Sequence, residues 1–104
     1  MDKNDALRIS RSYLNRLKES DIGFSEAYMF GSFAKGNQHE NSDIDIAIVL
    51  KDEVEHTFDT DVQLMITRKG EETIIEPHAF TKDEFDNNTP IVFQIIKHGI
   101  RIEL

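Results

Sequence analysis

The sequence contains no cysteine among its 104 residues. Disulfide bonds and thiolate metal sites are therefore excluded, and the composition is compatible with a reducing compartment. The four histidines are His39, His56, His78 and His98, and no two of them have the i, i+4 spacing of a zinc-binding helix. A zinc motif of the usual kind is therefore not supported.

Long apolar runs are also missing. No stretch approaches the about 20 apolar residues that a membrane-spanning helix needs. The polar N-terminus, Met1 to Asp5, leads into no apolar segment, so we expect no signal peptide and a cytoplasmic protein. We find no repeat, low-complexity segment or linker, and the length allows one core, so we expect a single domain over residues 1–104.

Basic residues are scarce. Twelve lysines and arginines face twenty acidic residues, and the net charge is −8. A nucleic-acid binder needs a basic face that displaces counterions from phosphates, and no run of Lys and Arg provides one. We therefore expect no nucleic-acid partner, whereas a nucleoside triphosphate escorted by magnesium is feasible because the ion brings its own positive charge.

The hydrophobic pattern predicts alternating helices and strands. We expect strands at 24–30, 43–50, 72–80 and 100–104, helices at 5–19, 32–36, 60–70 and 89–99, and a short helix that opens at Thr81. The strand at 43–50 is apolar on both faces and should be buried on both. Pro77 cannot donate a ladder hydrogen bond, so its strand should lie at an edge or carry a bulge.

Helix starts are predicted from capping patterns. Thr60 with Gln63, and Thr81 with Glu84, resemble capping boxes, and Thr89-Pro90 is a good N-cap and N1 pair. The apolar residues expected to face inward are Val62, Met65 and Ile66 on the first of these helices and Ile91, Val92, Ile95 and Ile96 on the last.

Residues 31–45 carry the most informative pattern. Gly31 and Ser32 follow an apolar run, and Asp43 and Asp45 open the next one. Carboxylates at i and i+2 on a strand point to one face, with Cα atoms about 7 Å apart, and can converge on divalent ions. A Gly-Ser turn before a helix exposes N–H groups that suit a phosphate. Together they indicate phosphoryl or nucleotidyl transfer.

Structural explanations exist for each of these residues. Asp43 could cap a turn, Asp45 and Glu76 could each pair with a lysine or arginine, and Ser32 could be an N-cap. Ser42 could fix its loop or touch a phosphate. His78 shares a strand face with Glu76, and we expect a packed or hydrogen-bonded residue there rather than a catalyst.

The spacing resembles a family signature. Gly-Ser, ten residues and then Asp-x-Asp is similar to the minimal nucleotidyltransferases of the DNA polymerase β superfamily, with Gly31, Ser32, Gly36, Ser42, Asp43 and Asp45 at the matching positions. The resemblance implies an α/β (α+β) nucleotidyltransferase fold, a small mixed sheet flanked by helices. It also implies a third carboxylate on a later strand, which Glu76 offers, where some members carry aspartate.

The resemblance further implies a reaction and a partner. Asp43, Asp45 and Glu76 would be the catalytic residues and ligands of two Mg²⁺ ions, and Gly31, Ser32 and Ser42 would bind the nucleotide, ATP or another NTP. Proteins of this length resemble antitoxins that transfer AMP to a HEPN-type toxin. A transferase for small molecules such as aminoglycosides, or a non-catalytic toxin-binding module, remain alternatives.

Overall fold

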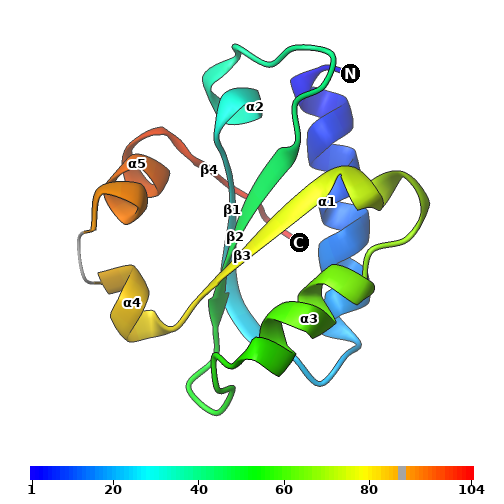
Figure 1. Ribbon diagram of the computed structural model, residues 1–104. Helices are drawn as coiled ribbons and strands as arrows, with labels where there is room; N and C mark the ends of the chain where they lie inside the picture. Colours follow the sequence, from blue (N-terminus) through cyan, green and yellow to red (C-terminus); the bar gives the residue numbers. More distant parts are fainter. Residues whose placement is uncertain (87–88) are drawn as a thin grey trace.

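The computed structural model describes residues 1–86 and 89–104, which form a four-stranded sheet with helices on both faces (Figure 1). The elements in chain order are α1 (Lys3–Lys18), β1 (Phe24–Phe30), α2 (Ser32–Lys35), β2 (Ile44–Leu50), α3 (Phe58–Ile66), the 3₁₀ helix η1 (Gly70–Ile74), β3 (Ile75–Phe80), α4 (Lys82–Asp86), α5 (Pro90–His98) and β4 (Ile100–Arg101). Within the described part of the chain, no helix is long and apolar enough to cross a bilayer.

The sheet is mixed, with strand order β3-β2-β1-β4. β1 pairs antiparallel with β2 and with β4, whereas β2 and β3 run parallel. The expected small mixed sheet flanked by helices is confirmed. β3 lies at an edge, as Pro77 predicted, because a residue without an N–H group is tolerated there.

Two apolar clusters sandwich the sheet. The larger one packs α1 and Leu64 of α3 against one face of β2, where Ile44, Ile46 and Ile48 are fully buried. The smaller one packs α4 and α5 against the other face, around Ala47 and Val49. β2 is therefore buried on both faces, and within the strand only the Asp45 side chain is partly exposed.

The two strands that precede the candidate site were predicted well, but several helix details were wrong. Thr57, not Thr60, caps α3, and the Thr60 hydroxyl accepts a hydrogen bond from the Thr57 N–H as the N3 partner of that cap. The N-cap therefore lies three residues earlier than expected, and the buried side of the helix is shifted. Leu64 faces the core, whereas Met65 and Ile66 are 41% and 64% exposed.

Corrections apply to α5 and β3 as well. In α5 only Val92 and Ile95 are buried, because this two-turn helix packs on the sheet through a narrow i, i+3 stripe that leaves Ile91 and Ile96 exposed. β3 begins at Ile75 rather than at residue 72, since the preceding residues form η1. The capping box at Thr81 and the N-cap at Thr89 are confirmed.

Candidate active site

The parallel pairing of β2 and β3 sets two carboxylates side by side. Asp45 and Glu76 are Cα partners in the register, so their side chains leave the sheet on the same face. Both lie at the end of the sheet where β2 begins and the smaller cluster no longer covers it. Their side chains are 26% and 53% exposed, so this acidic pair is accessible to solvent.

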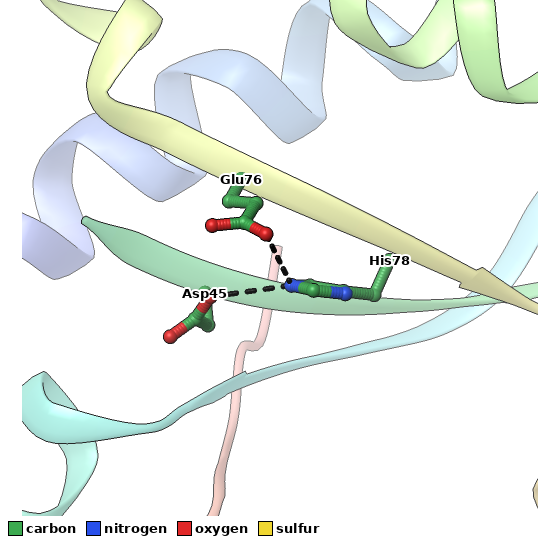
Figure 2. A group of neighbouring side chains, drawn as sticks. All are labelled: Asp45, Glu76 and His78. Atoms are coloured by element: carbon green, nitrogen blue, oxygen red, sulfur yellow. Dashed lines mark hydrogen bonds and ion pairs between the residues drawn. The ribbon is translucent and has the colours of Figure 1, made fainter.

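His78 joins these carboxylates, and Asp45, Glu76 and His78 together form the acidic cluster, a group of three possible metal donors (Figure 2). Its Nε2 lies 3.2 Å from Oδ1 of Asp45 and 3.7 Å from Oε1 of Glu76. The ring also packs edge-on against Phe30, with centroids 5.1 Å apart. The expected packed and hydrogen-bonded role of His78 is seen, whereas its position between the two acids was not predicted.

Asp43 lies just before β2 and is exposed. It lines a groove of about 400 Å³ together with Glu76 and His78, although it is not one of the three clustered donors. Asp61, Met65 and Arg68 also line this groove. The groove therefore runs from the acidic cluster to α3, along the open edge of the sheet.

No lysine or arginine of the described residues forms an ion pair with Asp43, Asp45 or Glu76. Arg68 is the basic residue of the groove, and its guanidinium donates to the main-chain carbonyls of Met65, Thr73 and Ile75. It therefore braces the entry to β3 rather than neutralising an acid. The carboxylates fit a divalent cation, since oxygen donors that no lysine or arginine neutralises are left to bind one.

The Gly31 bend lies directly beside Asp45. β1 ends at Phe30, which is the Cα partner of Asp45, and Gly31 follows with φ +75° and ψ −151°. A Cβ at position 31 would overlap with Oδ2 of Asp45. Glycine is thus required both for the backbone conformation and for the close approach.

Ser32 and Ser42 have different local roles. Gly31, not Ser32, is the N-cap of α2, so the simple capping explanation for Ser32 does not hold. Ser42 is buried, and its Oγ accepts a hydrogen bond of 2.9 Å from the His39 N–H. Ser42 therefore fixes the loop that leads into Asp43.

A buried ion pair supports the strand that carries Glu76. Glu72 in η1 is 3% exposed and accepts hydrogen bonds from the Arg16 guanidinium, the Ser12 hydroxyl and the Lys69 N–H. Burial alone would raise the pKa of Glu72, but these hydrogen bonds outweigh it and lower the pKa below its usual value. The contact fastens η1 to α1 immediately before β3.

A second support links the two helices behind the sheet. The Tyr13 hydroxyl of α1 donates to the Leu64 carbonyl of α3 at 2.6 Å, in a buried position.

A larger cavity, of about 750 Å³ around His56, lies at the far end of β2 and shares no lining residue with the groove. We therefore place the chemistry at the acidic cluster.

A family model for the nucleotidyltransferase domain of polymerase beta matches residues 13–103. The chain belongs to this family. It is therefore a nucleotidyltransferase of the polymerase β superfamily, as the Gly-Ser and Asp-x-Asp spacing indicated. Among curated proteins, no relative matches the sequence.

Solved structures share the nucleotidyltransferase fold. A candidate nucleotidyltransferase from Sulfolobus solfataricus has a TM-score of 0.70 and 22% identity, over 95% of this chain and 80% of the other. A toxin–antitoxin structure with AMP-PNP has a TM-score of 0.65 and 20% identity, over 89% of this chain and 71% of the other. A mutant of the toxin–antitoxin MntA-HpeT has a TM-score of 0.59 and 18% identity, over 99% of this chain and 73% of the other.

Proposed function

We propose that this nucleotidyltransferase moves AMP from ATP to a hydroxyl group of a protein, as the antitoxin of a HEPN-type toxin. The observation that carries the proposal is the register match of Asp45 with Glu76, beside the Gly31 bend. The family supplies the reaction class, and the acidic groove supplies a place for it.

In this proposal Asp43, Asp45 and Glu76 hold two Mg²⁺ ions, and Gly31 and Ser32 hold the β and γ phosphates. Mg²⁺ in phosphoryl-transfer sites is bound by one or two carboxylates together with substrate phosphates, which fits oxygen donors that no lysine or arginine neutralises. When bound, the two ions would neutralise the charge that develops on the phosphates during transfer. Ser42 contributes by fixing the loop before Asp43.

The reaction is a displacement at the α-phosphorus. The acceptor oxygen forms a bond to this atom, the bond to the bridging oxygen of the β-phosphate breaks, and pyrophosphate leaves. The Glu76 carboxylate accepts the proton of the acceptor hydroxyl, and its half-exposed side chain lies on the open edge strand. The main contributions of the protein are positioning and charge stabilisation.

A protein acceptor is favoured by the surface around the groove. Phe58, Met65 and Ile66 of α3 are apolar and 81%, 41% and 64% exposed. Met65 also lines the groove that holds Glu76, so this end of the apolar stripe reaches the groove. A partner that buries the stripe would place a hydroxyl near Glu76, and a net charge of −8 favours a basic partner over a nucleic acid.

The toxin is proposed as that partner from the comparisons and the motif. Two structures with this fold are described as toxin–antitoxin structures, one of them with AMP-PNP. Their low identity shows the fold alone, so the partner remains our proposal. The HEPN type follows from the family resemblance of the Gly-Ser and Asp-x-Asp motif.

The test is co-purification with the product of the neighbouring gene, followed by incubation with ATP and Mg²⁺ and intact-mass measurement. We expect the partner to gain the mass of one or more AMP groups. Asp45→Asn should abolish the gain while the protein still folds, and Glu53→Gln, an exposed acid outside the groove, should leave it unchanged. Binding of the partner without any mass gain in the wild type would instead favour a non-catalytic antitoxin.

A further inference from the structure

The donor group of the candidate site mixes nitrogen and oxygen. Asp45, Glu76 and His78 each offer one ligand atom, and these atoms lie within 4.8 Å of one another. We propose that His78 is a metal ligand and that this group binds a first-row transition ion such as Zn²⁺ or Mn²⁺ more tightly than Mg²⁺. The inference rests on the metal site of the proposed function and adds a residue and an ion class to it.

The spacing of the donors fits one ion. Ligand atoms about 2.1 Å from a tetrahedral zinc are about 3.4 Å from each other. The distances from His78 Nε2 to the two carboxylates are 3.2 Å and 3.7 Å, on either side of that value. An ion could therefore enter with small side-chain rotations.

The backbone and the ring packing hold this arrangement. The register pairs Asp45 with Glu76, and His78 follows two residues later on the same face of β3. Phe30 is the Cα partner of Asp45 on the neighbouring strand β1, and its ring packs edge-on against the imidazole. Figure 2 shows the Nε2 side of the ring turned toward both carboxylates.

A purely structural histidine would explain less of this geometry. The single Nε2–H can donate to one carboxylate, and the hydrogen bond to Asp45 uses it. The Glu76 oxygen at 3.7 Å is then near the ring without a hydrogen bond. An ion that replaces the proton would satisfy Nε2 and both acids together.

The ligand types determine the selectivity. Imidazole suits zinc, copper, iron and nickel, whereas magnesium prefers an all-oxygen environment. Loss of the imidazole should therefore weaken transition-ion binding far more than magnesium binding. Since removal of an outer-sphere partner alone costs about 10–100-fold in metal affinity, we expect loss of this ligand to cost at least about tenfold.

The experiment measures metal binding without ATP or partner, by calorimetric titration with ZnCl₂, MnCl₂ and MgCl₂. Free Mn²⁺ is counted independently by its electron paramagnetic resonance signal. The variants are His78→Gln, which replaces the imidazole near Asp45 with a neutral amide, and His98→Gln, a matched control on the exposed end of α5. Circular dichroism and thermal melting confirm that each variant is folded.

We expect His78→Gln to weaken Zn²⁺ and Mn²⁺ by at least about tenfold, while Mg²⁺ changes by less than about threefold. His98→Gln should match the wild type. Equal Zn²⁺ affinity in the wild type and His78→Gln would overturn the role of His78. If Asp45→Asn still lowered the affinity for all three ions in that case, the proposed magnesium site would stand. If Asp45→Asn also changed nothing, the metal site of the proposed function would fail as well.

Discussion

Gly31 lies so close to Asp45 that a β-carbon at position 31 would overlap with the Oδ2 of that carboxylate. The bend between β1 and α2 and the first acid of β2 are therefore one unit. A substitution at Gly31 should therefore displace the Asp45 side chain, although residue 45 itself is unchanged.

Gly31→Ala should damage both stability and metal binding. The backbone conformation at φ +75° and ψ −151° is essentially restricted to glycine, so we expect a loss of about 1–3 kcal/mol in the free energy of unfolding. The added methyl group should also displace Asp45 and lower Mn²⁺ affinity and AMP transfer. Urea unfolding and Mn²⁺ titration measure the two effects.

Gly36→Ala is the matched control, since Gly36 has φ +77° and an added Cβ there would meet no atom within 4 Å. It should cost about 1–2 kcal/mol of stability but leave Mn²⁺ affinity unchanged. Equal metal affinities in the two variants would contradict the coupling of the bend to Asp45.

Glu72→Gln should destabilise the protein by about 1–3 kcal/mol, because a neutral amide replaces the buried carboxylate that accepts a hydrogen bond from Arg16. Its sequence neighbour offers a control, since Glu71 pairs with Arg8 at the surface and both side chains are more than half exposed. Glu71→Gln should have no measurable effect. Urea unfolding of both variants checks the contrast, and equal midpoints would show that the buried contact adds nothing.

His56 should make stability depend on pH. Its Nδ1 lies 2.9 Å from Glu84 and its Nε2 lies 3.0 Å from Asp61, so it joins α4 to α3. The hydrogen bond with Glu84, and more weakly that with Asp61, raises the pKa of His56 above its ordinary value of 6.5. The hydrogen bond from His56 likewise lowers the pKa of Glu84 below 4.5.

A raised folded pKa contributes stability that is complete below 6.5 and is lost as the pH rises through the folded value. The lowered pKa of Glu84 contributes stability above 4.5 that is lost on acidification. We therefore expect the contribution of this cluster to be largest between these two values. His56→Gln should flatten the decline in urea midpoint as the pH rises above 6.5, and an unchanged decline would show that other groups cause it.

The exposed stripe of α3 should bind the partner. Phe58→Ser should weaken partner binding by about tenfold or more, because exposed apolar anchors contribute most of the energy of such an interface. The free protein should keep its stability within about 0.5 kcal/mol, since Phe58 is 81% exposed. Binding is measured by calorimetry with the co-purified partner.

Phe93→Ser is the control, as Phe93 is 52% exposed and its helix α5 lies on the opposite side of the sheet from α3 (Figure 1). We expect it to bind the partner normally. The reverse result, with weakened binding only in Phe93→Ser, would move the interface to α5.

The sequence predicted the strands of the site better than the contacts between them. β1 and β2 were evident because short apolar runs ended at glycine or at polar turn residues. The pairing of Asp45 with Glu76 depends on the register of two parallel strands, which no local pattern encodes. His78 was noted on the same face as Glu76, but its approach to Asp45 follows from that register.

The errors in the helices have local causes. The sequence places the N-cap of α3 at Thr60, one helical turn too late, because Thr57 and Thr60 both carry hydroxyls that can cap a helix. The 3₁₀ turn before β3 was missed because it depends on Arg16, which lies 56 residues from Glu72 in the sequence. Such long-range contacts override the local preference for an extended strand.

Pro77 lies on the open edge strand, between the glutamate and the histidine of the donor group. A proline cannot donate a main-chain hydrogen bond to a further strand, so a peptide could not lengthen the sheet without interruption past this residue. The open edge of β3 next to Glu76 is thereby protected from edge-to-edge aggregation. The protein substrate that we propose would then approach by inserting one side chain, which suits the modification of a single hydroxyl.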